Sequence, residues 1–282
     1  MNTFIYSTSR PVCKTLLPRL DIHRAMGLRE FIDEFADGDH ETSLSIVNSE
    51  QPPMVARMLN SLFEEQSVDV DEVARVLSES DVIQLRRDGR VVAESEFDDV
   101  RDSILAVNSD LYITGTRPLE DVDTPAVVRD LEGTRFRVRG YPAGTKGKLL
   151  LIEISRYIEA MALRHGDGEL HTGFQRLSRI VDERGTERAY EKLADTDLDV
   201  HVYGVGDPSP LESRALTVHD EDVPEIRRGW FVVFVPPPES EAVGAALVAV
   251  TEDDVEWDGV WTIDTGRARR VAAYLSAEYG QN

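Results

Sequence analysis

Apolar residues recur along this chain at two spacings, one typical of helices and one typical of strands. The clearest helical stripe lies in residues 27–36 and consists of Leu28, Phe31, Ile32 and Phe35. Residues 81–95 instead alternate between apolar and polar positions on both sides of Asp88-Gly89, a dipeptide that favours a tight β-hairpin turn. The N-terminal part of the chain therefore already combines helices with strands.

The same spacings predict the remaining elements. In the N-terminal part they indicate a strand over 42–48 and helices over 51–66 and 97–107. A short helix is expected to begin at Thr124-Pro125, and RFRVRGY (135–141) is expected to be a strand. The C-terminal part is predicted to contain a long helix over 147–165, strands over 169–175, 199–204, 230–235, 245–252 and 259–264, helices over 186–195 and 266–279, and a polar loop over 205–229.

This order of elements predicts a mixed α/β fold (α+β mixed), in which helices flank a mixed β-sheet. We expect a smaller N-terminal α/β module over 26–115 and a linker with a basic strand over 116–146. A larger C-terminal domain over 147–282 is expected to follow, opened by the long connecting helix. The chain of 282 residues is long enough for two such domains.

The charge balance is strongly acidic, with 53 acidic and 31 basic residues and a formal net charge of −22. Lysine is nearly absent, because Lys14, Lys146, Lys148 and Lys192 are the four in the chain. Such a surface is typical of a halophilic protein, because concentrated salt screens the repulsion between its carboxylates. The alternative interpretation is an ordinary acidic cytoplasmic protein.

Charge and composition also narrow the partners and the compartment. Neutralising phosphates requires a clustered basic face, so we do not expect this chain to bind nucleic acid. No apolar run reaches the roughly 18 residues that a membrane helix needs, so no membrane association is expected. The single cysteine, Cys13, cannot form an internal disulfide, which favours a reducing cytoplasm.

The first 25 residues differ in charge from the rest. They contain four basic residues and one acidic residue, whereas the acidic excess begins after Met26. A transit peptide has a similar composition, but the simpler interpretation is that translation starts at Met26. We therefore expect residues 1–25 to be a non-native or disordered leader.

Known catalytic and metal-binding motifs do not fit the chain. GYPAGTKGKL resembles a phosphate-binding loop, but Pro142 replaces the first glycine and Leu149 replaces the hydroxyl residue that holds Mg²⁺. DTDLDVHVYGVG fails as a calcium loop, because Val200 replaces the turn glycine and Gly206 replaces the bidentate glutamate. The histidine spacings match no zinc motif. These mismatches favour a non-catalytic protein without a metal site, and they identify no cofactor.

A basic cluster stands out within the acidic chain and is a hypothetical anion-binding site. Its members are Arg135, Arg137, Arg139, Lys146 and Lys148. The three arginines share one face of the predicted strand, and guanidinium groups suit phosphates and carboxylates. The alternative is an edge strand that its charges protect from aggregation, or arginines that pair with acidic neighbours.

A second hypothetical site lies on the two strands at 169–175 and 199–204. A strand-helix-strand unit favours parallel and adjacent strands, and period-two alternation then places polar side chains from both strands on one face. These side chains are His171, Gln175, His201 and Tyr203, and Trp230 and Trp261 are further ligand-binding candidates. We expect this face to be partly concave, whereas Leu170, Phe174, Val200 and Val202 pack into the core. The alternative is that a helix covers the polar face and its side chains hydrogen-bond to one another.

The segment 148–280 resembles the DICT sensory domain, especially its stand-alone form in halophilic archaea. The residues that carry the resemblance are Ser155-Arg156-Tyr157-Ile158-Glu159, Gly173-Phe174-Gln175, Tyr190, Leu193-Ala194, Val202-Tyr203-Gly204, Trp230, Gly259 and Trp261. The resemblance implies sensing rather than catalysis. It assigns no ligand and no functional residue.

The function expected from these features is that of a cytoplasmic, non-catalytic sensor. It would bind a small molecule and signal through a partner protein or through rearrangement of a homodimer. The alternative is a ligand-free adaptor for protein interactions, and a third interpretation is an enzyme with an unfamiliar site.

Overall fold

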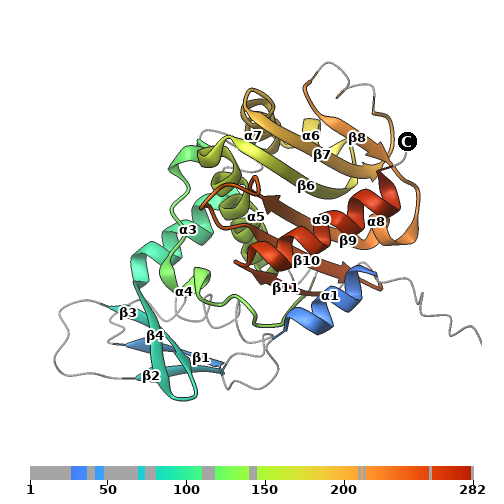
Figure 1. The fold of residues 1–282 in the computed structure, drawn as a ribbon. Helices are drawn as coiled ribbons and strands as arrows, with labels where there is room; N and C mark the ends of the chain where they lie inside the picture. Colours follow the sequence, from blue (N-terminus) through green and yellow to red (C-terminus); the bar gives the residue numbers. More distant parts are fainter. Residues whose placement is uncertain are drawn as a thin grey trace, which may run out of the picture.

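The computed structural model describes residues 27–36, 42–47, 69–73, 81–109, 118–139, 145–208, 211, 214–253 and 256–280. Their strands form a seven-stranded sheet, with helices on both of its faces, and a separate four-stranded sheet (Figure 1). This confirms the predicted mixed α/β class. The hypotheses about residues 1–25, including the start at Met26, and about a helix over 51–66 lie outside the described residues.

The larger sheet has the strand order β5-β11-β10-β9-β6-β7-β8. These strands are β5 (Phe136–Arg139), β6 (Asp167–Arg176), β7 (Asp197–Val205), β8 (Thr217–Asp220), β9 (Gly229–Val235), β10 (Ala245–Thr251) and β11 (Glu256–Thr262). β6, β7 and β8 run parallel to one another, as predicted for the first two, whereas the remaining neighbours are antiparallel. β10 is buried along its whole length because it lies between two strands and two layers of helices.

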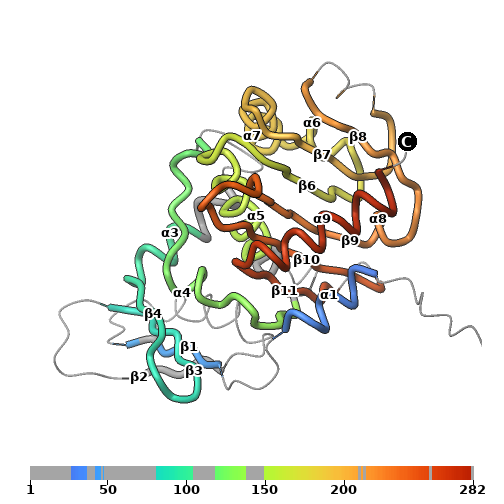
Figure 2. The backbone as a smooth tube through the Cα atoms, viewed as in Figure 1, coloured from blue at the N-terminus to red at the C-terminus, as the bar shows by residue number. Residues whose placement is uncertain are grey.

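Two layers of helices cover this sheet. One face packs against α5 (Thr145–His165), α6 (Arg179–Asp182) and α7 (Arg184–Ala194). The other face packs against α9 (Thr265–Tyr279), α8 (Pro224–Arg228) and α1 (Leu28–Phe35). All four residues of the predicted stripe in α1 are buried, against β10, β11 and α9, although α1 comes from far upstream in the sequence (Figure 2).

The smaller sheet has the strand order β2-β1-β3-β4. Its strands are β1 (Thr42–Val47), β2 (Asp69–Val73), β3 (Val82–Arg87) and β4 (Arg90–Glu96). Asp88 and Gly89 have φ values of 50° and 74°, the left-handed conformation that a tight hairpin requires. The chain then enters α3 (Phe97–Ser109), which packs against α5, and passes through the short helices η2 (Leu119–Asp121) and α4 (Ala126–Arg129).

Two features of the fold depart from the sequence analysis. The segment 205–229 is not a plain loop, because it contains β8 and α8, and β2 and α6 were also not predicted. α1 packs against the larger sheet, whereas the predicted division places it in the N-terminal module. That division into domains remains a prediction. Within the described part of the chain, none of the helices is long and apolar enough to cross a membrane.

Candidate functional site

A pocket of about 180 Å³ lies between α5, β6, the α6–α7 segment and β9. α5 contributes one wall because Ile152, Ser155, Arg156 and Glu159 recur at helical spacing and so share a face. The other lining residues are Thr172, Gly173, Phe174, Gln175, Arg179, Glu183, Thr186, Trp230 and Val232. The lining thus combines apolar and aromatic side chains with a few polar groups, as small-molecule sites do.

A buried ion pair forms the polar side of this pocket. Arg156 lies 2.7 Å from Glu159, and their side chains are 13% and 5% exposed. Arg156 also donates to the Thr186 hydroxyl at 3.0 Å, and Tyr190 donates to Glu159 at 3.0 Å. Burial lowers the pKa of Arg156, but the charge of Glu159 and its hydrogen bond outweigh this and leave that pKa above its usual value. Arg156 is therefore held in its charged form.

Trp230, at the start of β9, provides the aromatic wall. Its indole nitrogen donates to Ser155 Oγ at 3.1 Å, and the Ser155 hydroxyl donates to the Leu151 carbonyl at 2.8 Å. The indole ring also meets Trp257 edge-on at 5.8 Å between ring centroids. These contacts fix the orientation of a half-buried ring, so a flat apolar surface is held ready at the pocket.

Gln175 has an unusual backbone and an unsatisfied side chain. Its φ of 54° is left-handed, which is uncommon for a residue other than glycine, and the β6–β7 register shifts just beside it. The side-chain Nε2 donates to the Gly229 carbonyl at 2.5 Å, whereas Oε1 is buried and has no partner among the described residues. A buried acceptor without a donor costs about 1–3 kcal/mol, so this amide has an unused capacity to bind a donor.

Arg179 and Glu183 add an unpaired cation and an acid to the lining. Arg179 is half-buried, and its guanidinium makes no hydrogen bond or ion pair with any part of the chain that the structure describes. Glu183 accepts a hydrogen bond from the Thr186 hydroxyl at 3.0 Å. Burial raises the pKa of Glu183, and the Thr186 hydrogen bond and the charge of Arg179 offset part of that rise.

The opposite face of β6 and β7 carries the histidines singled out in the sequence. His171 and His201 are in register on neighbouring parallel strands, and their rings stack 4.5 Å apart with an angle of 5° between their planes. The Tyr203 hydroxyl lies 2.9 Å from His171 Nδ1. The Tyr203 ring stacks on the His219 ring of β8, with 4.3 Å between the ring centroids. The sequence analysis did not include His219 in this group. The predicted placement of His171, His201 and Tyr203 on one face of adjacent strands is confirmed.

This face is covered rather than concave. His171 and Tyr203 are fully buried and His219 is 5% exposed, with Tyr279 of α9 and Phe231 packed against Tyr203. Burial lowers the pKa of His171, and burial together with the neighbouring histidines lowers the pKa of His219 to about 4. The His171 and His219 rings are therefore neutral members of this cluster. Ligand binding by His171, His201 and Tyr203 remains a prediction.

Gln175 and Trp261 lie elsewhere than the histidine face. The left-handed backbone of Gln175 changes the alternation of β6, so Gln175 lines the pocket together with Thr172 and Phe174. The prediction that Gln175 shares the histidine face was wrong for this reason. Trp261 is 1% exposed and packs edge-on against Tyr157, outside the pocket lining.

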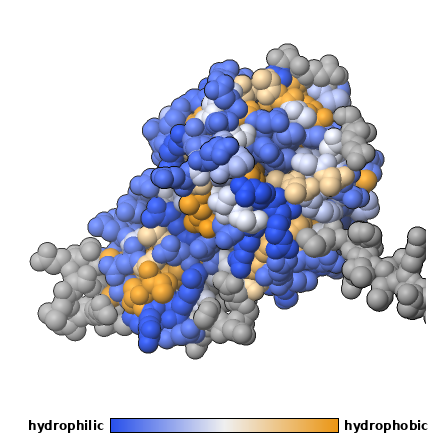
Figure 3. Space-filling view, viewed as in Figure 1, coloured by the Kyte–Doolittle hydropathy of each residue, from blue (hydrophilic) through white to orange (hydrophobic). Residues whose placement is uncertain are grey.

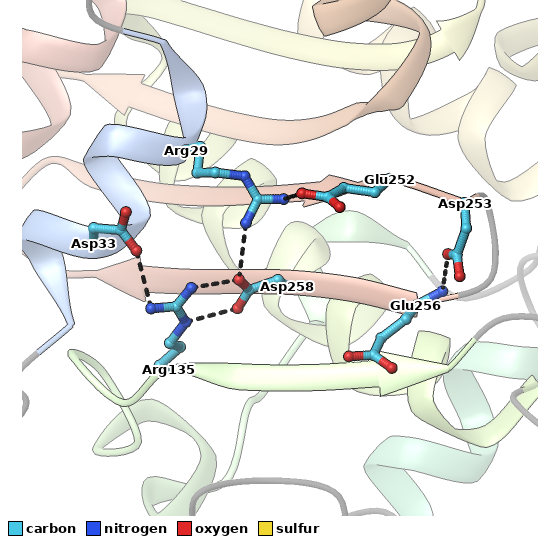
Figure 4. Close-up of polar contacts among 7 residues, drawn as sticks. All are labelled: Arg29, Asp33, Arg135, Glu252, Asp253, Glu256 and Asp258. Carbon is cyan, nitrogen blue, oxygen red and sulfur yellow. Dashed lines mark hydrogen bonds and ion pairs between the residues drawn. The ribbon is translucent and has the colours of Figure 1, made fainter.

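The basic strand is paired with carboxylates at its first arginine (Figure 4). Arg135 makes two hydrogen bonds to Asp258 of β11, at 2.8 and 2.5 Å, and one to Asp33 of α1 at 2.9 Å. Arg29 of α1 lies 3.4 Å from the same Asp258, so these charges fasten α1 to the sheet. Such pairing of the arginines with acidic neighbours is the alternative that the sequence analysis gave to anion binding.

The other basic residues leave the anion-binding hypothesis as a prediction. Arg137 and Arg139 of β5 lie opposite Asp258 and Glu256 of β11 in the strand register. The side chains of Arg139, Lys146 and Lys148 lie outside the described part of the structure, although their backbones belong to β5 and α5.

The charged lining of the pocket was not predicted from the residues themselves. Arg156 and Glu159 lie at i,i+3 spacing in a largely apolar stretch of α5, which is the signal that would have marked them as a buried pair. Arg179 and Glu183 carry no comparable sequence signal. The α6–α7 segment was therefore not recognised as part of a site. Several residues that carry the resemblance to the DICT family nevertheless line this pocket: Ser155, Arg156, Glu159, Gly173, Phe174, Gln175 and Trp230.

The described residues contain no group of three or more histidine, cysteine, aspartate or glutamate side chains that could hold a metal ion.

Residues 127–250 match the DICT family, described as the sensory domain in diguanylate cyclases and two-component systems. No curated protein matches the chain. A solved structure, polyphosphate kinase from Porphyromonas gingivalis, aligns at 10% identity over 87% of this chain and 47% of that chain, so this chain spans under half of that enzyme. The TM-score of 0.27 is too low to support any inference from this alignment.

Proposed function

We propose that the DICT sensory domain at residues 127–250 of this chain binds a small molecule in the Gln175–Trp230 pocket and passes a conformational signal to a partner protein or a second copy. A sensory or signalling role follows from the family. Binding at this pocket, and transmission from it, are the steps that we add.

Gln175 is the observation that carries the proposal. Its strained φ, its unsatisfied Oε1 and its place in the pocket lining coincide at one residue. Strained backbone and unpaired buried polar atoms persist where the surrounding structure holds them, and they are concentrated at binding sites. Oε1 itself is closed off from solvent, so a bound donor would satisfy it after a local shift of the Gln175 amide.

A continuous set of contacts connects Gln175 with the helices on the far face of the sheet. Gln175 holds the carbonyl of Gly229, the residue that directly follows α8. In α8, Glu225 accepts hydrogen bonds from the Leu28 amide of α1 at 2.7 Å and from Tyr274 and Tyr279 of α9 at 2.5 Å each. A shift of the Gln175 amide on ligand binding would therefore move a carboxylate that joins three helices. The α1–α9 surface is the output that we propose.

A metabolite library screened by thermal shift tests the binding step. A ligand present at a hundred times its dissociation constant stabilises the protein by about 2.7 kcal/mol. We expect such hits to lose this effect on Gln175→Met, which removes the amide, and to keep it on Trp261→Phe, which changes a buried aromatic residue outside the pocket. A library without hits, or hits that are indifferent to Gln175→Met, would contradict the proposal.

Hydrogen exchange tests the transmission step. We expect a bound hit to change the protection of α1 and α9, and Glu225→Gln to reduce that change while leaving affinity for the hit unaltered. Protection changes confined to the pocket would mean that the signal does not reach these helices.

A ligand-free adaptor is a second candidate function, because one exposed edge is apolar. β4 is an edge strand of the small sheet, and Val91 and Val92 are 44% and 45% exposed on it. A space-filling view shows an apolar patch over this sheet (Figure 3). Exposed apolar edges serve strand addition by partners. An adaptor would bind its partner equally well with and without library hits, whereas a sensor would not.

A further inference from the structure

The charges that line the Gln175–Trp230 pocket leave one cation and one acid without a close partner of opposite sign. The lining contains four charged residues, of which Arg156 and Glu159 neutralise each other at 2.7 Å. Arg179 and Glu183 remain, and they influence each other electrostatically without forming an ion pair. A ligand of matching chemistry would therefore carry one negative and one positive or proton-donating group.

Arg179 suits a carboxylate. A guanidinium offers two parallel N–H donors, which match the two oxygens of a carboxylate, and this geometry makes strong charge-assisted hydrogen bonds. Arg179 is half-buried, so a bound anion there would be screened less by solvent than one on an open surface. A doubly charged phosphate is disfavoured, because Glu159 and Glu183 are close by and the whole chain carries a net charge of −22.

Two acceptors of the lining residues suit an ammonium group, although one of them, Gln175 Oε1, is closed off from solvent and would be reached after a local shift of its amide. Gln175 Oε1 is buried and unsatisfied, and Gln175 as a residue is 8% exposed. Glu183 accepts one hydrogen bond, from Thr186, and has further lone pairs available. Burial disfavours the charged form of Glu183, and a cation beside it would counter that effect.

The remaining lining is apolar and would hold the body of the ligand. Ile152, Val232, Phe174 and the Trp230 indole provide this surface. An aliphatic or aromatic side chain would pack against the indole, whose orientation the Ser155 hydrogen bond fixes.

We propose that this pocket binds an amino-acid-like zwitterion, with its carboxylate at Arg179, its ammonium at Gln175 and Glu183, and its side chain against Trp230. This assignment rests on the proposed function, because it names the ligand class of the same pocket. It makes the chain a sensor of free amino acids or of close analogues.

The test uses the full chain and the standard set of protein amino acids, examined by saturation-transfer NMR and by isothermal titration. The best binder is then compared with its carboxamide, which lacks the negative charge, and with its deaminated acid, which lacks the ammonium. We expect both analogues to bind at least about tenfold more weakly, because each loses a charge-assisted hydrogen bond.

Arg179→Gln is the matching variant, and Arg176→Gln is its control, because Arg176 is exposed and lies outside the lining. We expect Arg179→Gln to weaken the amino acid about tenfold or more and to abolish the preference over the carboxamide. Arg176→Gln should do neither.

Three results would overturn the assignment: no amino acid binds, the carboxamide or the deaminated acid binds as well as the parent, or Arg179→Gln binds as the wild type does. If library hits that depend on Gln175 are found at the same time, the small-molecule sensor stands and its ligand class is wrong. If neither the amino acids nor the library bind, the proposed function fails together with this assignment.

Discussion

The stacked histidine cluster predicts that acid destabilises this protein well before its carboxylates are protonated. Burial and the neighbouring histidines lower the pKa of His219 from 6.5 to about 4 in the folded state. The unfolded chain then binds more protons than the folded chain between these two values, so stability is complete above about pH 6.5 and falls as the pH falls toward 4. His171, whose pKa is also lowered, adds an effect of the same sign.

The expected size follows from the shift at His219. Between about pH 7.5 and about pH 5, protonation that only the unfolded state accepts costs the native state about 2 kcal/mol. Carboxylates with ordinary pKa values remain largely ionised over this range.

Urea denaturation followed by tryptophan fluorescence, at constant high salt, measures this loss. The matched variant is His219→Phe, which keeps a ring stacked on Tyr203 but cannot be protonated. We expect the wild type to lose about 2 kcal/mol more than His219→Phe between the two pH values. Parallel losses in both proteins would refute the assignment of a neutral, buried His219.

Two further predictions concern the pocket and the surface. Arg156→Met leaves Glu159 buried without its cation and should lower the free energy of unfolding, measured by urea denaturation, by about 3–5 kcal/mol. The control Arg176→Met, at an exposed position, should change it by less than about 0.5 kcal/mol. Equal effects of the two substitutions would show that the ion pair is not structurally important. The melting temperature should rise as KCl increases from about 0.1 to about 3 M, because screening reduces repulsion within a chain of net charge −22, and a flat curve would contradict the halophilic interpretation.

The elements that could be predicted are those whose signal is local. The stripe in α1 and the Asp88-Gly89 turn follow from spacing and turn chemistry within a few residues. The parallel β6–β7 pair follows from the general preference of strand-helix-strand units. β8 and α8 escaped prediction because four or five residues are too few to establish a period.

The site was harder to predict, because it depends on contacts between distant segments. The histidine face was expected to be partly concave, but α9, formed by the last part of the chain, covers it, as the alternative interpretation had it. Gln175 was assigned to the wrong face because a positive φ at a glutamine cannot be predicted from the residue type. A single left-handed residue changes the alternation of side chains along a strand. The ion pair of Arg156 and Glu159 looked like an interruption of an apolar run, although it forms the wall of the pocket.

The order of strands in the larger sheet determines how the segment that matches the DICT family can be excised or fused to another protein. The stretch that matches the family ends at residue 250, within β10, whereas β11 and α9 come later and α1 comes much earlier. A fragment limited to 127–250 would leave β10 with an unpaired edge and β5 without the neighbour to which it is hydrogen-bonded. It would also expose the apolar face that α1 and α9 cover, including Phe231 and Val248, and would be prone to aggregate. A transplantable fragment therefore has to extend to α9 and include α1.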